Sequence, residues 1–157
     1  GNSNPHKTYL QPLHITHKKI IRLLSCMPPR IKRGDEWFYT HTQPLMHNHR
    51  ILNIFNLYTL RSCILMHPFI HPPTDTPTPN RPQHNHQYHL VSEHHRYPTS
   101  SATKQTLYIP NDPLTIHHST SQNSHTWNSL PLPLRQQDPI TTFKKQILNH
   151  LTNLQNT

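Results

Sequence analysis

Apolar side chains recur at helical spacing near the start of the chain. The recurring positions are Leu10, Leu13, Ile20, Ile21 and Leu24. Lys18, Lys19 and Arg22 lie largely off this stripe, so the pattern predicts an amphipathic helix over about residues 10–26. We place Pro12 in the first turn of this helix, where proline is tolerated.

A second helical stretch is predicted over about residues 44–66. Thr42 before Pro44 is typical of an N-cap followed by a first-turn proline, and Asn53 can cap a second helix within the stretch. The apolar face expected for this second helix comprises Ile54, Leu57, Tyr58, Leu60, Ile64 and Leu65. We expect it to end near His67-Pro68.

The C-terminal stretch predicts a third helix over about residues 139–154. Asp138-Pro139 combines a capping carboxylate with a first-turn proline. One face of the helix is then marked by Ile140, Phe143, Ile147, Leu151 and Leu154. This spacing is the clearest helical signal in the chain.

The remaining segments lack a clear period. Residues 30–42 read as a basic loop that contains an aromatic triplet, and residues 127–134 read as a turn interrupted by prolines. Residues near 106–117 support at most short, weak strands. The predicted fold class is therefore mostly α, built from a few amphipathic helices.

A proline- and histidine-rich stretch separates two parts of the chain. Residues 68–101 show almost no periodicity, which predicts a disordered linker. Residues 1–67 are then a helical segment, and residues 102–157 form a C-terminal tail with a terminal helix. The chain begins with Gly1, without an initiator Met, so we expect an internal piece of a longer protein.

Composition changes how the charge is interpreted. Residues whose codons begin with G (Gly, Ala, Val, Asp and Glu) number only 10 of 157, although Gly alone averages about 7% in proteins. His, Pro and Thr, whose codons are rich in A or C, number 17, 17 and 18. A coding strand poor in G explains both trends. The formal net charge of +9 is therefore inflated by the loss of acidic residues.

The chemistry of a catalytic or cofactor site is scarce. Six carboxylates include no Asp-Asp pair for a two-metal site, and two glycines cannot form a nucleotide-binding loop. The two cysteines lack a Cys-x-x-Cys partner, and the densest histidine cluster lies in the predicted linker. We therefore expect no catalytic residue, metal site, cofactor or small-molecule substrate, with a His-rich metal-binding protein as an open alternative.

Basic residues offer the more suggestive chemistry, because Lys and Arg neutralise phosphates and aromatic rings stack on unpaired bases. The candidate nucleic-acid contacts are Lys18, Lys19, Arg22, Arg30, Lys32, Arg33, Lys144 and Lys145. A solvated surface on a chain that has lost its acids would show the same charges. The chain contains no run of 18 apolar residues, which a membrane-spanning helix would need, so we expect no membrane partner. Its first residues lack the features of a signal peptide, so we expect no secretion.

Several short blocks of the chain form a pattern that extends over nearly its whole length. The first blocks are Gly1-Asn2-Ser3, Tyr9-Leu10 with Leu13, Lys18-Lys19, Ile21-Arg22, Thr40-His41-Thr42-Gln43-Pro44-Leu45, Ile51-Leu52-Asn53-Ile54 and Leu57-Tyr58. The later blocks are Leu107-Tyr108-Ile109-Pro110, Trp127-Asn128-Ser129-Leu130-Pro131 and Phe143-Lys144-Lys145-Gln146-Ile147-Leu148. In sequence, order and spacing, these blocks resemble the region that follows the polymerase core in LINE-type (non-LTR) retrotransposon reverse transcriptases.

The resemblance implies a parent that copies RNA into DNA and needs Mg²⁺. The catalytic aromatic-x-Asp-Asp turn of that family would lie upstream, so this piece would be a non-catalytic C-terminal segment. Residues 1–67 would then be thumb-like, with RNA or an RNA–DNA hybrid as partner. If the element is active, its product would work in the nucleus or the cytoplasm.

The chain also departs from the family pattern. His17 replaces a usual Gln, Asn123 replaces a usual Gly, the Arg usual near 97–101 is absent, and residues 30–38 look like an insertion. Such losses fit a decayed or partial copy of an element. A translated relic without biochemical function is therefore the alternative.

Overall fold

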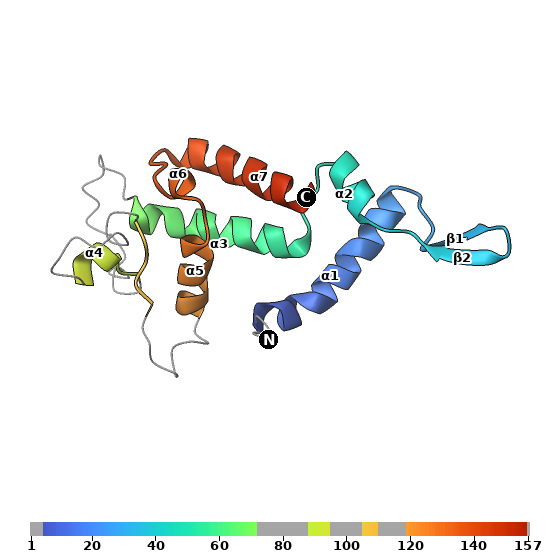
Figure 1. Ribbon diagram of the computed structural model, residues 1–157, viewed down its shortest axis with the longest axis horizontal. Helices are drawn as coiled ribbons and strands as arrows, with labels where there is room; N and C mark the ends of the chain where they lie inside the picture. The colour runs from blue at the N-terminus through green and yellow to red at the C-terminus, as the bar shows by residue number, and fades with distance from the viewer. Residues whose placement is uncertain (1–4, 72–87, 95–104, 110–118, 157) are drawn as a thin grey trace. The chain divides into compact units, whose positions relative to one another are not determined.

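The computed structural model is mostly helical and describes residues 5–71, 88–94, 105–109 and 119–156 (Figure 1). Its helices are α1 (Pro5–Leu24), α2 (Gln43–Asn48), α3 (Ile54–Ile70), α4 (Val91–His94), α5 (Ser119–Asn128), α6 (Leu132–Arg135) and α7 (Ile140–Asn156). Its strands are β1 (Arg30–Arg33) and β2 (Glu36–Tyr39). The predicted mostly-α class is confirmed.

The chain divides into two compact units. Unit 1 contains Gly1–Tyr58 and Asn149–Thr157, and unit 2 contains Thr59–Leu148. Long helices α3 and α7 each contribute one end to unit 1 and the rest to unit 2. Unit 1 therefore joins segments from the two ends of the sequence.

The core of unit 1 is small. Ile21, Leu45 and Met46 are buried together, and Met27 and Ile51 pack against them. Ile51 N–H donates to the Met46 carbonyl at 2.8 Å, which brings the chain back over α2. This core holds the C-terminal end of α1 against α2.

Most of the apolar stripe predicted for α1 is not core. Ile21 is buried, but Leu13, Ile20 and Leu24 are 54%, 47% and 72% exposed. The helix also begins at Pro5, so Pro12 lies in its interior rather than in its first turn. The predicted helix is present, but its apolar stripe is mostly exposed, because periodicity identifies a face, whereas burial depends on whether another element covers that face.

Thr42 and Asn53 hold the predicted cap positions of α2 and α3. Asn53 Oδ1 accepts a hydrogen bond from the Asn56 N–H at 2.9 Å, the standard N-cap contact. Thr42 is buried at the N-cap position of α2, but its side chain makes no capping hydrogen bond. Asp138 directs its carboxylate to His71 Nδ1 at 3.8 Å, just before α7.

The core of unit 2 is aromatic. The Phe143 ring centroid lies 4.6 Å from that of His67 and 5.6 Å from that of Trp127. All three side chains are buried, as is Ile147. Phe143, Ile147 and Leu151 are buried as the face predicted for α7 requires, whereas Leu154 on the same face is 57% exposed.

The buried face of α3 differs from the predicted one. Ser62, Cys63, Met66 and His67 are buried, whereas Leu65 on the expected face is 69% exposed. Apolar residues of α3 occur on all sides of the helix, so their spacing does not indicate which side is buried. The side is set by the aromatic residues that it meets in unit 2.

Trp127 was predicted in a turn but ends a ten-residue helix. α5 is rich in Ser, Thr and Asn and lacks an apolar stripe, which is why its sequence did not predict a helix. Trp127 Nε1 donates to the Gln105 carbonyl at 3.3 Å. Asn128 next to it holds the Leu107 backbone from both sides, accepting from its N–H at 2.8 Å and donating to its carbonyl at 2.9 Å.

The structure differs from the expected linker where it describes that region. α3 continues to Ile70, and Leu90 forms an isolated antiparallel bridge with Leu107 just before α4. Val91 and Leu107 are buried, so apolar contact compensates for the weak local signal. Residues 72–87 and 95–101 of the predicted linker, and the possible strand at 114–117, lie outside the described residues.

Candidate nucleic-acid interface

Unit 1 carries most of the excess positive charge. Eight of the fifteen Lys and Arg residues fall in this unit, against two of the six acidic residues. Of its two acidic residues, Asp35 lies between β1 and β2, and Glu36 is the first residue of β2. The candidate cations Lys18, Lys19, Arg22, Arg30, Lys32 and Arg33 are all in unit 1, and Lys144 and Lys145 are in unit 2.

The predicted basic loop is a β-hairpin. β1 pairs antiparallel with β2, and the register places Arg30 opposite Tyr39 and Lys32 opposite Trp37. Gly34 and Asp35 form the two-residue loop, with Gly34 at φ +62°, as a type II′ turn requires at its first central position. The loop prediction was wrong because the Gly-Asp signal between two four-residue runs was not recognised.

The register gathers cations and aromatic rings on one face of the hairpin. Directly opposed residues of an antiparallel pair point to the same side, and residues two apart along a strand share that side. Arg30, Lys32, Trp37 and Tyr39 therefore form one surface, which we call the cation–aromatic face. Trp37 is 62% exposed and Tyr39 is 65% exposed, so both rings are open to a partner.

Arg30 holds Tyr39 in place on this face. Its guanidinium carbon lies 4.5 Å from the centroid of the Tyr39 ring, and its Nη2 donates to the Tyr39 hydroxyl. A cation over an aromatic face gains about 0.5–1 kcal/mol at an exposed site. Phe38 alternates to the opposite side of the hairpin, where it pairs with Ile31.

The α1 cations have unequal surroundings. Lys19 is exposed, whereas Lys18 and Arg22 are half-buried. Arg22 Nη2 donates to the Thr40 carbonyl at 3.1 Å, which ties α1 to the end of β2. Among the described residues, Arg22 Nε is buried without a hydrogen-bond partner.

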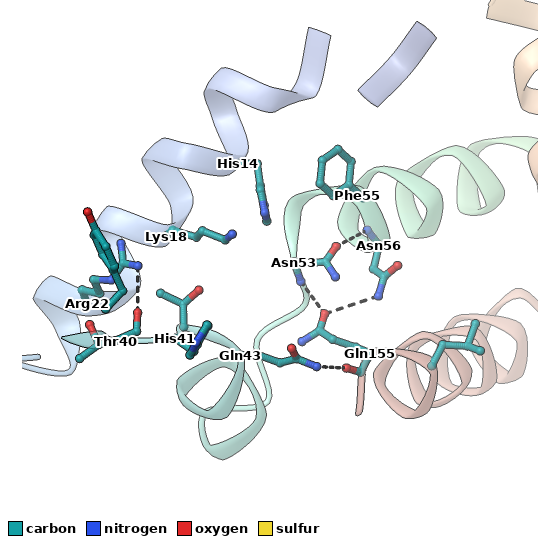
Figure 2. A pocket seen from close by; sticks show the side chains of 13 residues that line it. His14, Lys18, Arg22, Thr40, His41, Gln43, Asn53, Phe55, Asn56 and Gln155 are labelled. Carbon is teal, nitrogen blue, oxygen red and sulfur yellow. Dashed lines mark hydrogen bonds between the residues drawn. The ribbon is translucent and has the colours of Figure 1, made fainter. Parts of the chain in front are cut away.

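Lys18 and Arg22 line a cavity of about 560 Å³ within unit 1 (Figure 2). The other residues in its wall are His14, Tyr39, Thr40, His41, Thr42, Gln43, Asn53, Phe55, Asn56, Leu154 and Gln155. The wall therefore contains two cations and several amides, and no acidic residue is among those that the structure places there. Sequence reasoning identified the two cations but could not anticipate the amides from α3 and α7.

His14 and His17 of α1 favour their neutral form. Burial, and then the nearby positive charges of Lys18 and His17, lower the pKa of His14. Burial also lowers the pKa of His17. Both rings have a buried Nδ1 without a partner in the described part of the chain.

Lys144 and Lys145 are exposed on α7 in unit 2. Lys144 borders a second cavity, of about 430 Å³, together with His67, His71 and Asp138. His71 Nε2 hydrogen-bonds to the Arg135 carbonyl at 2.7 Å, and its Nδ1 faces Asp138. Both nitrogens of His71 are thus engaged with the protein.

Two kinds of feature are absent from the described residues, a membrane-spanning helix and a metal-binding cluster. None of their helices is long and apolar enough to cross a membrane. They also contain no group of three or more His, Cys, Asp or Glu side chains that could hold a metal ion.

Comparison with known proteins gives no match: no family model, no curated protein and no solved structure is similar to this chain at a significant level.

Proposed function

We propose that this chain is a non-catalytic, nucleic-acid-binding segment from the C-terminal region of a LINE-type reverse transcriptase, derived from a partial or decayed element. Its partner is RNA or an RNA–DNA hybrid. The sequence resemblance supports the family, and the charge of unit 1 supports the class of partner. The cation–aromatic face carries the proposal.

That face combines the two contacts that unpaired nucleic acid uses. Lys32 and Arg30 supply positive charge for phosphates, and Trp37 and Tyr39 supply exposed rings on which bases can stack. The two cross-strand pairs on this face are two residues apart along the strands, a separation of about 6.5–7 Å. Exposed Lys19 and half-buried Lys18 on α1 would add contacts to the nucleic-acid backbone, which bind without regard to sequence.

Salt dependence tests the charged contacts. A fluorescently labelled RNA–DNA hybrid is titrated with the whole chain, and log Kd is followed against log salt concentration. The K18Q/K19Q/R22Q variant should flatten the slope by up to about 0.9 per lost phosphate contact. Because Arg22 also holds Thr40, K18Q/K19Q is measured alongside it. R61Q, which removes an exposed cation from α3, should leave the slope unchanged.

Aromatic substitutions test the face itself. W37A should weaken binding to a single-stranded RNA by roughly 5- to 100-fold, because base stacking on an aromatic ring contributes about 1–3 kcal/mol. F38A removes an exposed ring from the opposite side and should have little effect. Equal losses for the two variants, or a salt slope unaffected by the α1 substitutions, would contradict the proposal.

A translated relic is the alternative, and the cysteines distinguish it. Cys63 is buried and Cys26 is exposed, and burial raises the pKa of the Cys63 thiol to about 12. A folded chain should therefore react with a thiol reagent at Cys26 and be protected at Cys63, because the thiolate is the reactive form. Mass spectrometry after a short pulse of iodoacetamide reads both sites. Equal labelling in buffer and in urea would indicate a relic that does not fold.

A further inference from the structure

We infer that the cavity of unit 1 is a binding site for a phosphate monoester of nucleotide size, with Lys18 and Arg22 as its anion-binding residues. This inference goes beyond the proposed function, because it assigns a small phosphate ligand to a cavity whose wall includes Lys18, Arg22 and Tyr39 of the proposed interface but not Trp37. It stands on the composition of the cavity wall, its unpaired buried atoms and its volume.

The wall is positive and has no counter-charge. Lys18 and Arg22 enter it from α1, and no Asp or Glu is among its lining residues. Figure 2 shows the Lys18 side chain extending from α1 toward the first turn of α3, and the His14 ring directed into the same space. A site lined by cations without acids concentrates anions.

The first turn of α3 contributes on the opposite wall. Asn53, Phe55 and Asn56 line the cavity there, and the N-terminal end of a 17-residue helix carries partial positive charge. The amides are held in place: Gln155 Oε1 accepts from the Asn53 N–H at 2.7 Å, and Asn56 Nδ2 donates to the Leu151 carbonyl at 3.3 Å. The wall is therefore preorganised.

Two polar atoms of the lining residues lack partners in the described part of the chain. They are Arg22 Nε and His14 Nδ1, both buried. An unpaired buried donor is destabilising, and more so when the group is charged. A bound phosphate would supply further oxygen acceptors for the Arg22 guanidinium, which already donates from Nη2 to the Thr40 carbonyl, and neutral His14 can donate from one of its two ring nitrogens.

The volume sets the size of the ligand. A cavity of about 560 Å³ lies within the range of roughly 300–1,000 Å³ that is typical of small-molecule sites. An inorganic phosphate fills a small part of it, whereas a nucleoside monophosphate occupies much more. Phe55 and His14, whose ring centroids are 4.8 Å apart, offer aromatic ring surfaces for the rest of the molecule.

Calorimetric titration of the whole chain tests the site, with AMP, inorganic phosphate, adenosine and a 5′-phosphorylated oligonucleotide as probes. AMP should bind at least about tenfold more tightly than adenosine, because a charged hydrogen bond contributes about 1.5–3 kcal/mol. Tight binding of AMP identifies a free nucleotide as the source. Tighter binding of the oligonucleotide than of its unphosphorylated form identifies a strand end.

Matched lysine variants locate the site. Lys18 lines the cavity, whereas its neighbour Lys19 is exposed and does not. K18Q should weaken AMP binding by roughly tenfold or more, K18R should restore most of it, and K19Q should leave it unchanged. Equal effects of K18Q and K19Q, or equal affinity for AMP and adenosine, would overturn the inference. W37A should not affect AMP binding, which separates this test from that of the hairpin.

Discussion

His67 is a polar side chain in an aromatic core. It is 2% exposed, lies beside Phe143 and Trp127, and donates from Nε2 to the Gln137 carbonyl at 2.7 Å. That bond accounts for a buried imidazole, because it satisfies the donor of the neutral ring. Burial lowers the pKa of His67, and this outweighs the opposing influences of its hydrogen bond and of Asp138.

The stability of unit 2 should therefore fall in acid. Below the usual His pKa of about 6.5, the unfolded chain binds a proton that folded His67 resists, so the free energy of unfolding decreases as pH falls through that value. The stability that neutral His67 contributes should be fully present above about pH 7. Urea unfolding followed by circular dichroism between pH 5 and 8 measures this trend.

The variant H67Q isolates the contribution of this residue, since His14 and His17 also have lowered pKa values. H67Q should lower stability at pH 7.5 and make the decline between pH 7 and pH 5 shallower. H125Q, which alters an exposed position on α5, should leave the wild-type profile. An unchanged pH profile in H67Q would contradict this account.

The hairpin is the element on which the nucleic-acid proposal depends. Its strands are only four residues each, and its charged and aromatic side chains are almost all exposed. Thr40 fastens its base by donating from the N–H to the Pro29 carbonyl at 3.1 Å and from Oγ1 to the Pro28 carbonyl at 2.6 Å. The turn and these bonds, rather than a core, therefore hold the cation–aromatic face in register.

Gly34 should be the most sensitive turn position. A Cβ there meets no atom within 4 Å, but the φ of +62° is unfavourable for a side chain. G34A should cost about 1–2 kcal/mol through backbone strain alone. NMR spectra of G34A should show the loss of cross-strand contacts in the hairpin. The same variant should bind single-stranded RNA more weakly.

Two variants provide controls for the turn. G34N should be milder, since Asn tolerates positive φ better than Ala. D35A changes the neighbouring loop residue, which has no positive φ, and should have a small effect. Equal losses for G34A and D35A would refute the role assigned to the Gly34 backbone.

At the scale of the molecule, unit 1 depends on the last residues of the chain. The Gln155 side chain accepts from the Asn53 N–H and donates to the Ile51 carbonyl at 2.9 Å, across more than 100 residues of sequence. Gln43 Nε2 also donates to the Gln155 carbonyl at 3.1 Å. The C-terminal turn of α7 is thus part of the wall around the unit 1 cavity (Figure 2).

Q155A should loosen the start of α3. It removes the partners of one backbone N–H and one carbonyl, each worth about 1–3 kcal/mol if left buried and unpaired. Hydrogen exchange at the Asn53 amide should become faster by roughly tenfold or more. Q155E keeps an acceptor for that amide and should preserve more of its protection. Unchanged exchange in Q155A would show that the contact does not stabilise unit 1.

Local sequence determined the elements whose signals are short-range. The Asn53 cap, the Phe143 and Ile147 face of α7 and the mostly-α class follow from side-chain chemistry and spacing within a few residues. The Gly34-Asp35 turn was encoded just as locally. The positive charge of α1 is likewise a property of the sequence alone.

The tertiary structure decided which of these faces are covered. Ile21 is buried and Leu24 is exposed on the same predicted stripe, and α3 buries Cys63 and His67 instead of Leu65. Burial depends on contacts between residues distant in sequence, which periodicity does not contain. The cavity and the hydrogen bonds of the Gln155 side chain to Asn53 and Ile51 also depend on such contacts. The two ends of the chain must meet before Lys18, Asn53 and Gln155 can line one cavity.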